Sequence, residues 1–111
     1  MGLFDFSGKN KLPYQLKLFV SGESSHTESI VACIESILDE KIAGQYNLEV
    51  VNILMNDKPA KQYGVISTPT LAWIKPEPVR KIFGSLYVPK KMREALAFLD
   101  EMLKESPSPG K

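Results

Sequence analysis

The sequence predicts an α/β domain in which helices cover a mixed sheet of four strands. Three observations lead to this fold class. Short apolar segments typical of strands alternate with longer segments whose apolar residues recur at helical spacing. A strand, a long helix and a second strand near the start favour a right-handed parallel βαβ unit. Two later strands joined by the stretch KPEP favour an antiparallel pair.

The first strand is expected in YQLKLFV, which begins at Tyr14. Leu16, Leu18 and Val20 share one face of it, and Phe19 makes the other face partly apolar, so the strand is expected inside the sheet. A long helix is expected within residues 23–44, where apolar residues recur at helical spacing. These residues are Ile30, Cys33, Ile34, Ile37 and Leu38.

Three further strands and one short helix follow. Strands are expected in YNLEVVNIL, TLAWI and VRKIFG, which lie within residues 46–54, 70–74 and 79–84. The stretch NDKPAKQYGV, residues 56–65, predicts a turn and one or two turns of helix, with Pro59 near the helix start.

The C-terminal stretch VPKKMREALAFLDEMLKE, residues 88–105, predicts a single long helix. Its residues are strong helix formers, and Pro89 suits the first turn. The apolar stripe consists of Met92, Ala95, Leu96, Leu99, Met102 and Leu103.

The resulting order, β-α-β-α-β-β-α, is the thioredoxin-like architecture. That fold places a cis-proline just before its third strand, and Pro69 in STPT stands at this point. Residues 14–104 are expected to form the domain, between a flexible segment 1–13 and a disordered tail 105–111. Leu3, Phe4 and Phe6 form either a short docking strip or part of a flexible terminus.

Composition excludes several classes of function. The chain has 111 residues, a formal net charge of +1 and a pI of about 7.8, without the basic excess of a nucleic-acid binder. One cysteine and one histidine form neither an intramolecular disulfide nor a zinc site by themselves. No stretch approaches the ~20 apolar residues of a membrane helix. We expect a cytoplasmic protein without metal or cofactor.

Thiol chemistry is the first activity to consider for this architecture. A thioredoxin-like enzyme needs a thiolate at the start of its first long helix, where the helix dipole lowers the thiol pKa. The matching stretch GESSHTES contains no cysteine, and Cys33 lies further along on the apolar stripe. A cysteine among aliphatic residues acts as a small apolar side chain. His26 near the helix start is expected to be solvated. A binding protein rather than an enzyme is therefore expected.

Three stretches carry a family resemblance: YQLKLFVSG from Tyr14, ILDEKIAGQYNLEVVNIL from Ile37, and STPTLAWIKPEPVRKIFGSL from Ser67. They resemble the KaiB family of bacterial clock proteins, over almost the whole chain apart from its ends. The most specific residues are Thr68, Pro69, Thr70, Leu71, Pro76, Pro78, Val79, Arg80 and Gly84.

The resemblance implies a non-enzymatic protein that docks on the ring-shaped ATPase KaiC and regulates its phosphorylation cycle. It also implies two folds for the C-terminal half. One is thioredoxin-like and binds the partner, and the other is rearranged and assembles into homo-oligomers, dimers or tetramers. Ala95 and Ala97 stand where clock members tend to carry glycine and an acid, and alanine favours the helix of the thioredoxin-like form. Some KaiB-like proteins are tied to stress responses, so both outputs stay open.

The residues expected to contact a partner are Lys58, Lys61 and Tyr63 of the short helix region, with Arg80 and Lys81. Charge complementarity of this kind sets partner choice and association rate. Cations on an edge strand also discourage edge-to-edge pairing, which is the competing interpretation of Arg80 and Lys81. The chain departs from the family at Ser29 and Gly64, where members usually carry basic residues.

Two other functions remain open beside the regulator. One is a thiol-dependent redox protein of thioredoxin fold. The other is a stand-alone sensor domain of a histidine-kinase or response-regulator pathway, since a similar domain begins certain sensor kinases of the same clock. Nucleic acid and membrane are not expected partners.

Overall fold

The computed structural model describes residues 9–22, 25–84, 86 and 88–105. The expected docking strip at Leu3, Phe4 and Phe6 and most of the expected C-terminal tail lie outside these residues. The described elements are η2 (Lys9–Lys11, a 3-10 turn), β1 (Tyr14–Val20), α1 (Ser25–Ile42), β2 (Tyr46–Asn52), α2 (Lys58–Gln62), β3 (Thr70–Lys75), β4 (Arg80–Phe83), α3 (Pro89–Ala95) and α4 (Phe98–Glu105).

The strands form one mixed sheet in the order β2-β1-β3-β4. β1 runs parallel to β2 and antiparallel to β3, and β3 runs antiparallel to β4. This is the thioredoxin-like arrangement that the order of elements predicts, and the prediction of the fold class is confirmed.

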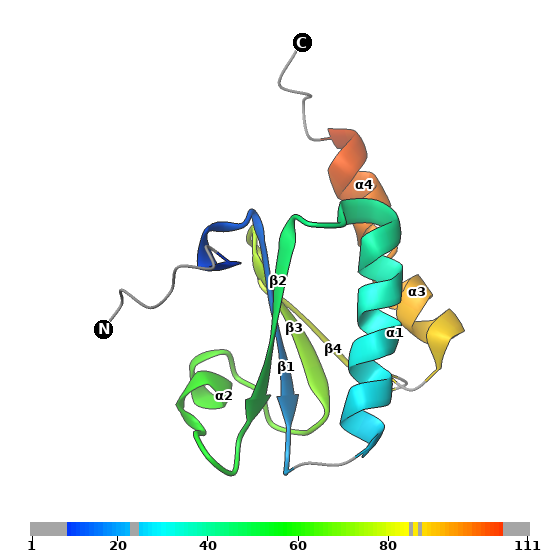
Figure 1. Ribbon diagram of the computed structural model, residues 1–111. Helices are drawn as coiled ribbons and strands as arrows, with labels where there is room; N and C mark the ends of the chain where they lie inside the picture. Colours follow the sequence, from blue (N-terminus) through cyan, green and yellow to red (C-terminus); the bar gives the residue numbers. More distant parts are fainter. Residues whose placement is uncertain (1–8, 23–24, 85, 87, 106–111) are drawn as a thin grey trace.

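Helices lie on both faces of the sheet. α1, α3 and α4 cover one face, and α2 lies on the other (Figure 1). The larger core cluster, between the sheet and the three helices, includes Leu16, Leu18, Ile34, Leu38, Leu71, Trp73, Leu96 and Leu99. The smaller cluster, under α2, consists of Phe19, Val51, Ala60, Ala72 and Ile74.

β3 contributes to both clusters, which explains its unbroken apolar run. Leu71 and Trp73 belong to the larger cluster, while Ala72 and Ile74 belong to the smaller one. Successive side chains of a strand point to opposite faces, so a strand that is covered on both sides is apolar at every position.

The C-terminal helical stretch differs from its prediction. The structure divides it into α3 and α4, with a turn at Leu96 and Ala97. The Ala97 N–H donates to the Glu94 carbonyl and the Leu99 N–H to the Leu96 carbonyl, both across three residues rather than four. The sequence there contains only helix formers, so tertiary packing overrides local propensity.

The contact that accompanies this break is aromatic. Phe98, the first residue of α4, packs edge-on against Trp73 with the ring centroids 5.2 Å apart. Trp73 is fully buried, and its indole N–H donates to the Pro76 carbonyl at 3.0 Å. The turn at Leu96 sets the direction in which α4 begins, and thereby presents Phe98 to the indole.

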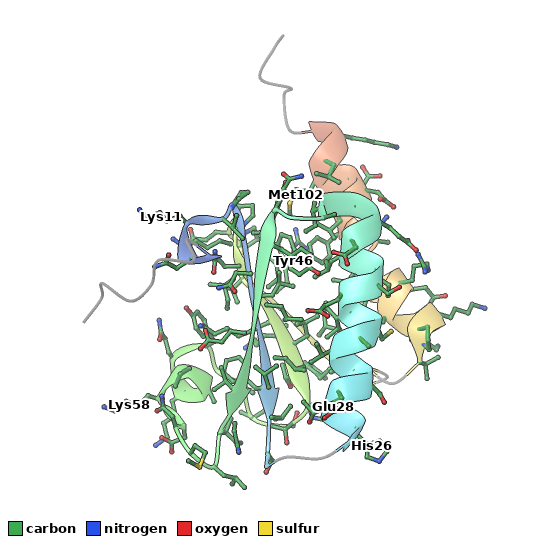
Figure 2. The ribbon with its side chains drawn as sticks, in the orientation of Figure 1. Lys11, His26, Glu28, Tyr46, Lys58 and Met102 are labelled. Atoms are coloured by element: carbon green, nitrogen blue, oxygen red, sulfur yellow. The ribbon has the colours of Figure 1, made fainter. Side chains whose placement is uncertain are left out.

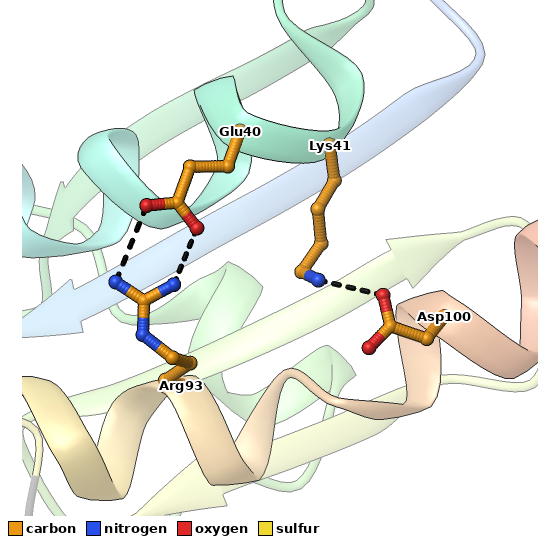
Figure 3. Close-up of polar contacts among 4 residues, drawn as sticks. All are labelled: Glu40, Lys41, Arg93 and Asp100. Carbon is orange, nitrogen blue, oxygen red and sulfur yellow. Dashed lines mark hydrogen bonds and ion pairs between the residues drawn. The ribbon is translucent and has the colours of Figure 1, made fainter.

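Two ion pairs join α1 to the divided stretch (Figure 3). Glu40 of α1 accepts both guanidinium hydrogen bonds from Arg93 of α3. Lys41 of α1 donates to Asp100 of α4 at 2.6 Å. Neighbouring residues of α1 therefore contact α3 and α4 separately.

Candidate partner-binding surface

Four of the five residues expected to contact a partner lie on one side of the molecule. Lys58 and Lys61 are on α2, and Tyr63 follows it directly. Lys81 on β4 reaches the same region, because its ammonium donates to the Gly64 carbonyl at 3.3 Å. We call Lys58, Lys61, Tyr63 and Lys81 the α2 face. Figure 2 shows Lys58 on the side of the sheet away from α1.

The lysines of the α2 face are exposed. Lys61 lies 3.3 Å from the Asp57 carboxylate, one helical turn earlier. Such exposed pairs are weak and exchange readily with solvent, so they leave a cation available to a partner. Tyr63 is half-buried and packs on the smaller core cluster. The α2 face therefore offers positive charge around an anchored aromatic ring.

Arg80 lies on the other face of the sheet. Its guanidinium carbon is 4.5 Å from the centroid of the Phe98 ring. Lys81, the next residue along β4, points to the α2 side instead, as strand alternation requires. The structure therefore separates two cations that the sequence analysis treats as a pair, and it gives Arg80 a contact within the chain.

An apolar groove adjoins Lys81. Its lining includes Val65, Ile66 and Phe83, and its volume is about 380 Å³. Ile66 is 96% exposed and Phe83 is 65% exposed, so both present apolar surface to solvent. We call it the β4 groove; its lining consists of Gly64, Val65, Ile66, Ser67, Thr70, Lys81 and Phe83.

Ile66 and Phe83 were not among the residues that the sequence pattern marked as a partner surface. A signal for Phe83 was present, because it lies two residues from Lys81 on a strand and must share its face. Nothing local marks Ile66, which reaches the groove only because the loop before β3 passes beside β4.

Gly64, at the junction of the α2 face and the β4 groove, has a backbone conformation that favours glycine. Its φ is +70°, in the left-handed region that favours glycine, and a Cβ there would lie 3.1 Å from the Lys81 ammonium. The ammonium of Lys81 therefore lies directly beside Gly64.

A small cavity lies where thioredoxin-like enzymes hold their thiolate. It has a volume of about 100 Å³, and its lining includes His26 and Thr27 at the start of α1 and Thr68 and Pro69 before β3. The peptide bond between Thr68 and Pro69 is cis. No cysteine occurs in this part of the sequence.

Cys33 lies elsewhere on α1 and packs on the larger core cluster. Burial raises the pKa of its thiol, and the positive charge of Arg93 offsets this effect only in part. A raised pKa lowers the fraction of thiolate at neutral pH, which is the opposite of what a redox nucleophile needs.

Within the described residues, no group of three or more His, Cys, Asp or Glu side chains is placed to hold a metal ion. No helix among them is both long and apolar enough to cross a bilayer.

The KaiB domain profile matches residues 17–98, which include the second half of β1, the other three strands, α1, α2 and α3. The chain belongs to the KaiB family. It is 37% identical to the circadian clock oscillator protein KaiB of Microcystis aeruginosa over 95 residues, which are 86% of this chain and 91% of that protein. The KaiB of Nostoc punctiforme is 35% identical over 97 residues, 87% of this chain and 93% of its own length.

Solved structures show the same fold at lower identity. The N-terminal domain of Synechococcus elongatus SasA superimposes with a TM-score of 0.67 at 20% identity, over 87% of this chain and 90% of that one. Thioredoxin 1 of Thermosipho africanus gives a TM-score of 0.61 at 14% identity, over 82% and 99% of the two chains. These likenesses establish a thioredoxin-like fold for this KaiB-family chain.

Proposed function

We propose that this chain is a non-enzymatic clock or stress-response regulator that docks on a KaiC-type ATPase through the α2 face. The observation that carries the proposal is the family match over residues 17–98, together with relatives named as clock oscillator proteins. The exposed lysines of the α2 face also support the proposal, because positive charges of this kind complement an acidic surface on a partner.

The redox alternative receives less support. It requires a reactive thiol beside the cis-proline, and the sequence places none there. The cysteine that the chain does have is half-buried among apolar side chains, with a raised pKa.

The sensor-domain alternative rests on the likeness to SasA. At 20% identity that likeness supports a shared fold alone. Identity to KaiB proteins reaches 37% over most of both chains, which favours the regulator.

Three finer features belong to the same proposal. We infer a cytoplasmic location, assembly into dimers or tetramers, and a C-terminal half that adopts a second arrangement in the oligomer. In this proposal the second half of the chain differs between the two arrangements, and this half contains the whole α2 face and the β4 groove.

The test mixes the purified full-length chain with a KaiC-type ATPase from the same genome. We expect the two to co-elute in size-exclusion chromatography and the rate of ATP hydrolysis or autophosphorylation to change when the chain is added. The proposed function would be refuted if the ATPase elutes alone, and if its rates of ATP hydrolysis and autophosphorylation stay unchanged at every concentration of the chain.

A further inference from the structure

The outer edge of β4 is open in the part of the chain that the structure describes. β4 is the last strand of the sheet, and among the described residues it pairs with β3 alone. Every second residue of an edge strand turns its backbone N–H and C=O outward, where they accept an extended segment as a further strand. The side chains on the two sides of β4 determine which segment fits.

On the α2 side, the edge is bordered by the β4 groove. Ile66 and Phe83 expose 96% and 65% of their area there, although side chains of this type favour burial. Lys81 lies two residues from Phe83 and shares its face. Its ammonium donates to the neutral Gly64 carbonyl, and it belongs to none of the ion pairs found among the described residues. This side therefore offers an apolar wall next to a cation that has no acid opposite it.

On the α3 side, the edge is bordered by a second hollow. Its volume is about 190 Å³, and we call it the α3 hollow; its lining consists of Ile82, Phe83, Leu86, Lys91, Met92 and Ala95. Ile82 packs on the larger core cluster, and so lies on the face of the sheet that α1 and α3 cover. Phe83 lines both hollows, so the two meet at the end of β4. A strand added at this edge would place alternate side chains over the two hollows.

The spacing of the β4 side chains specifies the added strand. Side chains directly opposite each other on neighbouring strands have their Cβ atoms about 4.5–5.5 Å apart. An acid is favoured opposite Lys81, and an apolar residue is favoured opposite Phe83, two positions along on the same face. The residue between them lies opposite Ile82 and points to the α3 hollow, where an apolar side chain fits. In an antiparallel strand, the pattern from the N-terminus is apolar, apolar, acid.

A second copy of β4 fits this edge poorly. Pairing of β4 with itself would bring Arg80 and Lys81 of both chains into one short ribbon, and like charges on neighbouring strands are destabilising. Lys91, which is exposed at the α3 hollow, adds to the positive charge around the edge. Charge complementarity therefore favours an acidic occupant over a second copy.

We propose that the outer edge of β4 is a docking site for an extended acidic and apolar segment of another protein. The segment adds a strand antiparallel to β4, places apolar side chains over the β4 groove and the α3 hollow, and sets its acid against Lys81. Because Lys81 also belongs to the α2 face, a partner on that face and the docked segment compete for it. The docking does not depend on the proposed function, and its test contains no ATPase.

A peptide titration tests the site directly. The probe is the synthetic peptide Thr-Thr-Phe-Val-Glu-Thr-Thr with both ends blocked, added to the isotope-labelled full-length chain. We expect saturable shifts of the amide signals of Ile66, Lys81, Phe83 and Met92. The amide of Glu49 should not shift, because it lies on β2 at the opposite edge of the sheet. Shifts on β2 equal to those on β4, or none on β4 up to the solubility limit of the peptide, overturn the proposal.

A charge exchange tests the position of the acid. Lys81→Glu should weaken binding of the glutamate peptide about fivefold, and it should bind a peptide with lysine at that position more tightly than the wild-type chain does. Lys104→Glu, the same charge change at an exposed position of α4, serves as the matched control and should bind both peptides like wild type.

Phe83→Ser should weaken both peptides, because the apolar wall is lost; its side chain is exposed, so the variant is expected to fold. The site is also overturned if the Lys81→Glu variant and the wild-type chain do not distinguish the two peptides. Shifts of the β4 signals with the concentration of the chain alone, without peptide, would identify a second copy as the occupant and contradict the proposal.

Discussion

The guanidinium of Arg80 stacks over the ring of Phe98, with 4.5 Å between its carbon and the ring centroid. Phe98 in turn meets Trp73 edge-on, and the ring centroids of Tyr14 and Trp73 are 5.6 Å apart. Arg80 thus ends a row of aromatic contacts that attaches α4 to the sheet. Its neighbour Lys81 points to the opposite face and joins the α2 face.

This separation predicts different effects for the two cations. Arg80→Ala should lower the free energy of unfolding by about 0.5–1 kcal/mol, the usual contribution of an exposed cation–π contact. Lys81→Ala should leave it nearly unchanged, because the hydrogen bond from its ammonium to the Gly64 carbonyl is exposed to solvent. Urea denaturation of the two variants measures both values. Equal losses in the two variants would contradict the assignment of Arg80 to the aromatic row.

The ion pair between Glu40 and Arg93 predicts a dependence of stability on pH. The hydrogen bond from Arg93 holds the pKa of the Glu40 carboxyl below its usual value of 4.5. A carboxyl with a lowered pKa stabilises the folded chain fully above its unfolded pKa, and loses this contribution as pH falls through the folded value. Glu40→Gln should therefore be less stable than wild type near pH 6.

The difference in melting temperature should shrink as the pH is lowered below about 4.5, the usual value for this group. Glu94→Gln, at an exposed position of α3, serves as the matched control. A gap between Glu40→Gln and wild type that stays constant from pH 6 to pH 3 would exclude a role for this carboxylate in stability.

The raised pKa of Cys33 predicts a slow thiol. Alkylation by iodoacetamide at pH 8 should proceed more slowly than for free cysteine, because burial lowers both the thiolate fraction and access to it. The chain should show no turnover in an insulin-reduction assay. Turnover in the wild-type chain that disappears in Cys33→Ser would support the redox function instead.

The division of the C-terminal helical stretch changes how much Ala95 and Ala97 can each favour the helical form. Ala95 ends α3, whereas Ala97 lies in the turn before α4. Alanine gains its advantage, about 1 kcal/mol over glycine and roughly half of that over an acid, inside a helix, so Ala97 in the turn contributes little to the preference. We predict that the dilute chain alone keeps helical backbone chemical shifts over residues 89–95 and 98–105. Strand-like shifts there in the major species would show that the rearranged form prevails.

Much of the fold follows from local patterns in the sequence. The alternation at Leu16 and Leu18 and the helical recurrence at Ile34 and Leu38 depend only on which faces are covered, and these elements form as predicted. The break at Leu96 was not predicted, because the residues around it favour helix. In the structure it is accompanied by an aromatic contact between Phe98 and Trp73, 25 residues apart in the chain.

The candidate site was predictable in part. Exposure of Lys58 and Lys61 follows from their charge and from the shortness of α2. The opposite directions of Arg80 and Lys81 follow from strand alternation alone, once VRKIFG is accepted as a strand. The β4 groove was not predictable. It forms where the loop around Ile66 lies against β4, and no local pattern in the sequence indicates that these two segments are in contact.

The most direct test of the account is the rate at which the chain associates with a KaiC-type ATPase, measured over a series of salt concentrations. Reversal of two charges on the α2 face, Lys58→Glu with Lys81→Glu, should slow association roughly tenfold at low salt and weaken its salt dependence. The control, Lys90→Glu with Lys104→Glu, changes the net charge equally at exposed positions of α3 and α4 and should associate like wild type. An α2-face variant that keeps the wild-type rate and salt slope would contradict the account.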